Sequence, residues 1–198
     1  FESQQKSFEY SLRYLNKLTK KIQEFNFKDL DRKLKIINDI KPIFIVGVPR
    51  SGSTLIEKII ASSSRKIPIG EEIGIIQNIF QKEIISNKNN LNHYLENIKN
   101  NIINEYKQRG LIKKNANFIF TDKSLENFFY IGLIKIIFPH AKIINCKRDP
   151  LSSIISIIKN NLNKIAWAHT TEYIFKYFDM YFQYIEYWNK IFPNFIYD

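Results

Sequence analysis

The chain has 198 residues, of which only one is a cysteine and three are histidines. The lone Cys146 cannot form an internal disulfide, and its spacing from the histidines is not that of a zinc site. Lys135 and Pro139 interrupt the longest apolar stretch, which stays short of the roughly eighteen apolar residues of a membrane span. These absences exclude a disulfide scaffold, a zinc enzyme and a membrane-spanning protein. We expect a soluble, cytoplasmic protein.

Acidic residues are scarce beside basic ones: 19 aspartates and glutamates stand against 30 lysines and arginines, for a net charge of +11. Such an excess attracts anionic ligands, among them a polyanionic nucleotide, an acidic acceptor or a nucleic acid. Short basic runs such as Lys113-Lys114 are typical of a solvated face, so nucleic-acid binding has weak support. With 44% hydrophobic residues, a chain of this length can bury the core of one domain.

The spacing of apolar residues indicates the organisation of the chain. Residues 1–39 carry them at helical intervals, which predicts a helical N-terminal segment of two helices. From residue 40 strands and helices alternate, which predicts a parallel sheet with helices on both faces. The fold class is therefore α/β, a P-loop-like three-layer α/β/α domain. The expected strands are 43–48, 118–121 and 142–146, and the expected helices are 53–63, 71–84, 90–108, 125–137, 151–161 and 171–191.

An apolar strand that breaks at glycine and continues as a helix occupies residues 43–60. Gly47 and Gly52 have the spacing of a P-loop, but a serine stands where that motif needs lysine. Free N–H groups at a helix start, hydroxyls and an arginine fork are all anion-binding groups. The alternative is a tight strand-to-helix turn with a good helix cap and no ligand. We expect a phosphate-binding loop that does not serve the γ-phosphate of ATP, formed by Arg50, Ser51, Gly52, Ser53 and Thr54.

A second block covers residues 141–156. Residues 142–146 predict a short buried parallel strand, and Pro150 suits the first turn of the next helix. Arg148 then lies at the carboxyl end of a strand, as Arg50 does. Ligands of open α/β sheets bind at that edge, near a switch in strand order, so one nucleotide could bridge both arginines.

Together the two blocks resemble the sulfotransferases that use 3′-phosphoadenosine 5′-phosphosulfate (PAPS). Pro49-Arg-Ser-Gly-Ser-Thr54 is similar to the 5′-phosphosulfate loop of that family, with Ser53 where threonine is commoner. Arg148 and Ser156, eight positions apart, match its 3′-phosphate motif. The resemblance covers residues 40–198 and implies PAPS as the donor, the desulfated nucleotide PAP as a product, and no metal.

A third block, residues 118–132, resembles the segment after the middle strand of the family. Leu125 replaces a proline of the family pattern, whereas Lys123 and Asn127 stay in register. The resemblance implies that Lys123 contacts the sulfuryl group or its bridging oxygen, where it could neutralise charge on the departing phosphate. The alternative is a surface lysine before a capping residue, Ser124.

A hydroxyl acceptor must lose its proton as it attacks sulfur, so a base is needed. Related tyrosylprotein enzymes carry a glutamate shortly after the 5′ loop. A gap-free count from Arg50 selects Glu71, which we assign as the catalytic base, whereas alignment on a Gly-Glu-Glu triplet would select Glu72. Both could instead cap a helix that starts near Gly70.

The histidines are weaker candidates for the base. His93 and His140 are typical of polar surface or turn positions. His169 lies in a segment, residues 166–171, that resembles one before the long C-terminal helix of bacterial members, and it could line the acceptor side.

Bacterial relatives of the tyrosylprotein enzymes often carry tetratricopeptide repeats upstream, so residues 1–39 could end such an array. Residues 194–198 are typical of the opening of another strand, and we expect residues 40–198 to lack the C-terminal part of a full domain. The acceptor stays open: tyrosine in a peptide, a carbohydrate, a lipid or a small alcohol or amine would suit the same donor half.

Two other functions compete with sulfotransfer. A P-loop nucleotide kinase or NTPase would use the glycine spacing and Asp149 as a magnesium ligand, but lacks the lysine at position 53. A non-catalytic nucleotide- or nucleic-acid-binding module would keep the fold without the chemistry.

Overall fold

The structure is a computed structural model. It describes residues 40–63, 66–86, 91–113, 119–160, 162 and 165–198, together with residue 13. The helix pair expected within residues 1–39 therefore lies outside the described residues, apart from residue 13.

Within the described residues, four parallel strands form the sheet, in the order β2-β1-β3-β4. The strands are β1 (Ile43–Gly47), β2 (Thr121–Asp122), β3 (Lys142–Cys146) and β4 (Ile196–Tyr197). The register pairs Phe44 with Asp122 on one side and with Ile143 on the other. The chain passes from β1 outward to β2, and from β3 outward to β4 in the opposite direction. The order thus switches between β1 and β3, so the segments that follow these two neighbours diverge and leave a crevice at their carboxyl ends.

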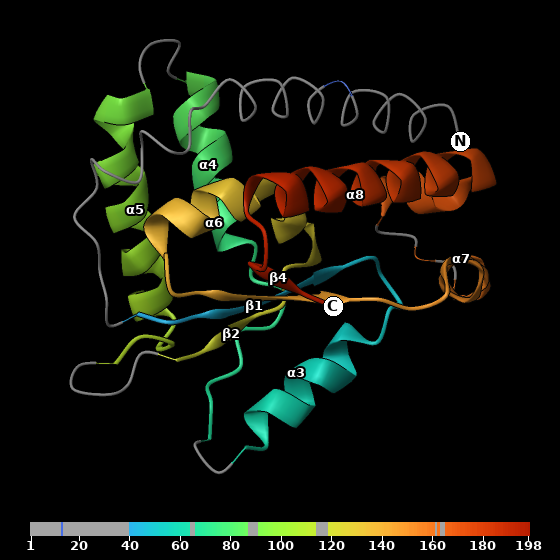
Figure 1. The fold of residues 1–198 in the computed structure, drawn as a ribbon, viewed down its shortest axis with the longest axis horizontal. Helices are drawn as coiled ribbons and strands as arrows, with labels where there is room; N and C mark the ends of the chain where they lie inside the picture. Colours follow the sequence, from blue (N-terminus) through green and yellow to red (C-terminus); the bar gives the residue numbers. More distant parts are fainter. Residues whose placement is uncertain are drawn as a thin grey trace.

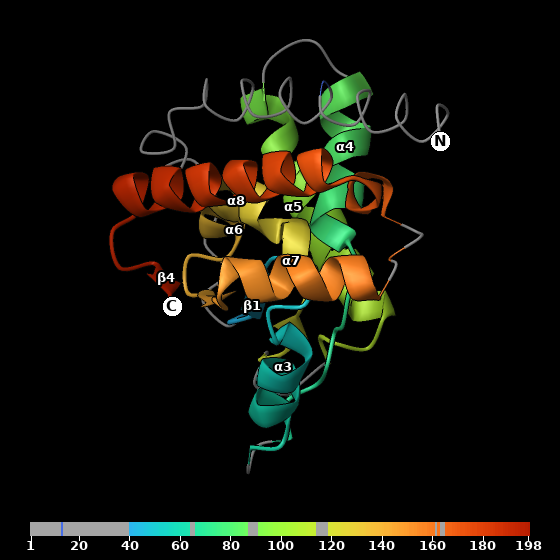
Figure 2. The same cartoon turned by 90° about the vertical axis from the view of Figure 1, so that its right-hand side faces the viewer.

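Helices lie on both sides of the sheet. They are α3 (Ser53–Ala61), α4 (Ile75–Ser86), α5 (Leu91–Gln108), α6 (Ile131–Ile137), α7 (Pro150–Lys159) and α8 (Thr171–Ile191), with the 3₁₀ helices η1 (Leu125–Tyr130) and η2 (Ala166–His169). Figure 1 shows α4, α6 and α8 on one side of the sheet and α3 on the other. Seen from the carboxyl edge in Figure 2, α7 lies between α8 and α3. The expected α/β fold with helices on both faces is confirmed.

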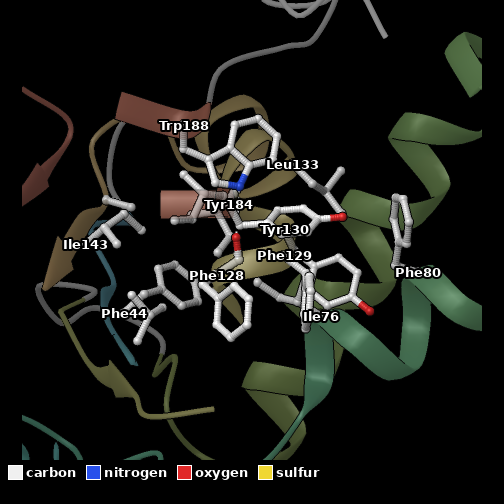
Figure 3. Close-up of a cluster of buried hydrophobic side chains, with 14 of the residues drawn as sticks. Phe44, Ile76, Phe80, Phe128, Phe129, Tyr130, Leu133, Ile143, Tyr184 and Trp188 are labelled. Atoms are coloured by element: carbon white, nitrogen blue, oxygen red, sulfur yellow. Dashed lines mark hydrogen bonds between the residues drawn. The ribbon is translucent and has the colours of Figure 1, made fainter. Parts of the chain in front are cut away.

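The core lies between the sheet and the side that carries α4, α6 and α8 (Figure 3). Phe44 of β1 and Phe128 of η1 are fully buried, and Trp188 of α8 donates a hydrogen bond from Nε1 to the carbonyl oxygen of Phe128, at 2.8 Å. Burial of each such large side chain contributes roughly 1.5–3 kcal/mol. The core therefore holds η1, which directly follows β2 and Lys123, in a fixed position against the sheet.

Most expected elements agree with the structure to within two residues, and the strand 142–146 and the helix 171–191 agree at both ends. The region 125–137 divides into η1 and α6. The helix expected from residue 71 begins only at Ile75, a difference with consequences for the site.

Candidate active site

The loop after β1 starts at Gly47, where the backbone conformation and the close packing require glycine. Gly47 has φ +151°, and a Cβ atom there would lie 3.0 Å from the carbonyl oxygen of Cys146 and 3.2 Å from Ser51 Oγ. Any side chain would therefore push the loop away from β3. The N–H group of Ser51 donates to the carbonyl oxygen of Val48 at 3.3 Å, which closes the turn.

The helix α3 begins without a side-chain cap. Its N-cap is Gly52, in the left-handed region at φ +97°, so the first N–H groups of the helix have no side chain of the cap to bind. Among the described residues, the buried Ser51 Oγ also has no hydrogen-bond partner. Uncapped N–H groups and an unpaired hydroxyl are the features of an anion site at a helix N-terminus.

Arg50 joins this loop to α7. Its Nε donates to Ser156 Oγ at 3.0 Å, and Nη1 of Arg148 donates to the carbonyl oxygen of Arg50 at 3.1 Å. Both arginines are exposed, and Arg50 adopts a left-handed φ of +69°. The structure thus brings together the three residues that the sequence placed in two separate motifs.

A cleft of about 560 Å³, here called the main cleft, opens beside this junction. Its basic walls are Arg50, Lys58 and Arg148, and Gly52, Ser53 and Thr54 line it from the start of α3. Three cations and a helix N-terminus around one cleft favour a polyanion. Ser51 and Ser156 do not line the main cleft.

Asp149 has a structural role at the start of α7. Its carboxylate accepts a hydrogen bond from the N–H group of Ser152 at 2.7 Å and caps α7, with Pro150 in the first turn. This hydrogen bond lowers the pKa of the Asp149 carboxyl. The described residues contain no group of three or more acidic, histidine or cysteine side chains that could hold a metal.

Lys123 follows β2 in a turn that a buried carboxylate organises. Asp122 accepts hydrogen bonds from Tyr106 Oη at 2.5 Å, the N–H group of Ser124 at 2.9 Å and Asn127 Nδ2 at 3.1 Å. Burial raises the pKa of the Asp122 carboxyl, and these hydrogen bonds partly offset the rise. Because the turn is fixed on three sides, the direction of the Lys123 side chain is fixed too.

Lys123 is a buried lysine and not a surface one. Its side chain is 7% exposed, and Nζ lies 2.7 Å from Glu72 Oε1. The sequence suggested that Ser124 caps the following helix, but its side chain makes no capping hydrogen bond to η1. Its Oγ instead accepts a hydrogen bond from the N–H group of Gly74, at 2.8 Å. That bond ties the segment before α4 to the turn after β2.

The Gly-Glu-Glu segment is not helical and packs beside β2, so the expectation that Glu71 and Glu72 start a helix is wrong. Thr121 N donates to the carbonyl oxygen of Pro68 at 3.0 Å and Lys123 N donates to that of Glu71 at 2.9 Å. A Cβ atom at Gly70 would lie 2.0 Å from the carbonyl oxygen of Thr121. These contacts hold the segment beside the strand, and a helix becomes possible only after Gly74.

Glu57 supports this arrangement from α3. Its side chain is 3% exposed, and Oε1 accepts hydrogen bonds from Thr121 Oγ1 at 2.7 Å and from the N–H group of Glu71 at 3.2 Å. Sequence reasoning missed Glu57. The signal that could have found it is its place on the helix directly after the loop, one helical turn beyond Ser53.

The two adjacent glutamates are both exposed but take different positions. Glu72 lines the main cleft and pairs with Lys123, whereas Glu71 has φ +53° and lines neither the main cleft nor the smaller cavity beside it. Leu125, which stands in place of the proline of the family, also lines the main cleft.

A smaller cavity of about 210 Å³, here called the side hollow, adjoins the main cleft. Pro49, Glu72, Leu125 and Ile165 line both. The residues that line only the side hollow are Gly74, Gln77, Ser124, Glu126, Trp167 and Tyr177. The hollow thus begins at Glu72 and extends away from the basic walls.

The histidines lie elsewhere. His140 is exposed in the turn before β3, the side chain of His93 is outside the described residues, and His169 lines neither cavity.

Residues 42–198 match the model of the sulfotransferase family. The chain belongs to the sulfotransferase family. Members of this family generally use PAPS as the sulfuryl donor, and the resemblance seen in the sequence is confirmed. An uncharacterized protein of Aquifex aeolicus (strain VF5) is 30% identical over 171 residues, which cover 80% of this chain and 22% of that protein. The chain thus spans less than a quarter of the length of this relative.

None of the helices that the structure describes is long and apolar enough to span a bilayer. The family indicates a transferase with a nucleotide sulfate donor and a separate acceptor.

Proposed function

We propose that the protein transfers the sulfuryl group from PAPS to a hydroxyl or amine acceptor, with PAPS in the main cleft. The observation that carries the proposal is the contact of Arg50 with Ser156 and Arg148, because it joins the two nucleotide motifs into one basic site. The loop and Arg50 bind the 5′-phosphosulfate together with Ser51, Gly52, Ser53 and Thr54, and Arg148 and Ser156 bind the 3′-phosphate.

Lys123 neutralises the leaving group in this proposal. Its side chain is buried and does not line the main cleft itself, but its Nζ pairs with Glu72, which does. A fixed cation in a site shielded from water stabilises developing negative charge far better than one in bulk solvent. As the acceptor oxygen forms its bond to sulfur, the bond from sulfur to the phosphate oxygen breaks and PAP leaves with the charge that Lys123 offsets.

Glu72 receives the proton of the acceptor. The sequence favoured Glu71, with Glu72 as the alternative, but only Glu72 lines both the main cleft and the side hollow. A base must come within hydrogen-bond reach of the proton it removes. We therefore propose Glu72 as the base, and Glu71 as a residue whose backbone holds the segment against β2.

An assay for product formation tests this proposal. With PAPS and a panel of phenols, sugars and amines, the protein should form PAP and a sulfated product. Lys123→Ala should lower the rate at least about 100-fold, as loss of an electrostatic catalytic group does. Lys147→Ala is the control, because Lys147 also follows a strand of the sheet, β3, but pairs with Asp198. Equal rates for the two variants would contradict the role of Lys123.

A further inference from the structure

The side hollow differs in charge from the main cleft. None of the described residues that line it is basic, although the chain carries a net charge of +11. Its two ionisable carboxyl groups are Glu72, at the end shared with the main cleft, and Glu126, which lines the hollow alone. A basic nucleotide site thus opens into an acidic acceptor site.

Glu126 is held in place from two helices. Burial raises the pKa of its carboxyl group, and the polar side chains of Gln77 of α4 and Tyr177 of α8, which line the same hollow, partly offset the rise. A carboxylate offers about four acceptor positions, so two partners leave capacity for a third. Burial and the nearby Glu126 raise the pKa of Tyr177 well above its usual value, so Tyr177 remains a hydroxyl that donates.

The other walls of the hollow are mostly apolar. Trp167 stacks on Tyr177 with ring centroids 3.8 Å apart, and Leu125 and Ile165 complete the surface toward the main cleft. With about 210 Å³ the hollow is smaller than the usual cavity for a drug-sized ligand. It suits one ring or a short chain with a single polar end.

We infer that the acceptor is a small amphipathic molecule whose hydroxyl faces Glu72 and whose ammonium group binds Glu126. The orientation of the acceptor, with its hydroxyl towards Glu72, rests on the proposed function. An ammonium group compensates a carboxylate that has lost its hydration, and it is also attracted to aromatic faces such as that of Trp167. An acidic acceptor, which the net charge alone would favour, meets repulsion in this hollow.

Three phenols that differ in charge test the inference: tyramine (cationic), 4-ethylphenol (neutral) and 3-(4-hydroxyphenyl)propanoate (anionic). Each is titrated calorimetrically into the protein with and without saturating PAP. We expect tyramine to bind at least about tenfold more tightly than 4-ethylphenol, and the propanoate most weakly. Glu126→Gln should remove the preference for tyramine and leave the affinity for 4-ethylphenol unchanged.

Glu172→Gln is the matched control, because it removes one negative charge from an exposed position on α8 that lines neither cavity. It should keep the preference. Equal affinities for the three phenols, tightest binding of the propanoate, no binding of any, or a preference that survives in Glu126→Gln would overturn the inference. Failure of PAP to bind would contradict the proposed function instead, while the titrations without PAP still measure the charge preference of the hollow.

Discussion

Arg50 and Ser156 lie 106 residues apart in the chain, yet Arg50 Nε donates a hydrogen bond of 3.0 Å to Ser156 Oγ. The contact connects the loop after β1 with α7, which begins just after β3. Since β1 and β3 are neighbours at the switch in strand order, the sheet itself sets the distance between the two nucleotide motifs.

This contact makes Arg50→Lys an informative change. Lysine keeps the charge but lacks the planar fork that can bind Ser156 and a phosphate oxygen pair together. We expect PAP affinity to fall about tenfold, which corresponds to ~1.4 kcal/mol. Calorimetric titration measures the change, with Lys58→Arg as a charge-preserving control on the same cleft. Unchanged affinity in Arg50→Lys would show that charge alone suffices.

Glu72→Gln and Glu71→Gln separate the two candidate bases. Removal of a general base typically costs about 10²–10⁴ in rate, so Glu72→Gln should lower kcat by that factor and leave PAP affinity unchanged. Glu71→Gln should keep nearly full activity, because its side chain lines neither cavity. Steady-state kinetics on the purified variants decides between them. The reverse pattern would restore the assignment that the gap-free count gave to Glu71.

Gly70→Ala should destabilise the protein strongly. The added Cβ would lie 2.0 Å from the backbone carbonyl oxygen of Thr121, which cannot move without displacing β2. Overpacking of this kind costs about 1–3 kcal/mol or more. Gly110→Ala is the control, since nothing lies within 4 Å of its Cβ and only the strain of φ +73° remains. Urea unfolding compares them, and equal losses would mean that the segment can move away from β2.

Tyr106→Phe should destabilise the protein more at neutral pH than in acid. The hydroxyl of Tyr106 lowers the pKa of Asp122, whose folded-state pKa is raised by burial, so the variant raises that pKa further. A carboxyl group with a raised folded-state pKa contributes stability below its unfolded pKa and loses it as pH rises through the folded value. The difference in unfolding free energy between wild type and Tyr106→Phe should therefore grow from about pH 4 to pH 8. A difference independent of pH would show that Asp122 does not ionise in this range.

The sequence was sufficient where local signals and tertiary structure agree. The strand 142–146 is a short apolar segment, and the helix 171–191 has apolar residues at helical spacing, so both were predicted at both ends. The Arg148–Ser156 spacing was visible as a motif, but its contact with Arg50 depends on the order of the strands, which no local pattern encodes.

The segment around Glu71 and Glu72 could not be predicted, because its conformation is imposed from outside. Helical spacing suggested a helix from residue 71, whereas the close approach of Gly70 to Thr121 and the hydrogen bonds to β2 keep the segment beside the strand and out of a helix. The same long-range contacts place Glu72 beside Lys123. Glu126 was missed for a related reason: its partners Gln77 and Tyr177 come from two distant helices.

Calorimetric titration with PAP, compared with ATP and magnesium, tests the central claim most directly. If the junction of Arg50, Ser156 and Arg148 is a PAPS site, PAP should bind without a metal and far more tightly than ATP, and Arg148→Ala should abolish that preference. Binding of ATP with magnesium in place of PAP, or PAP binding that Arg148→Ala leaves intact, would contradict it.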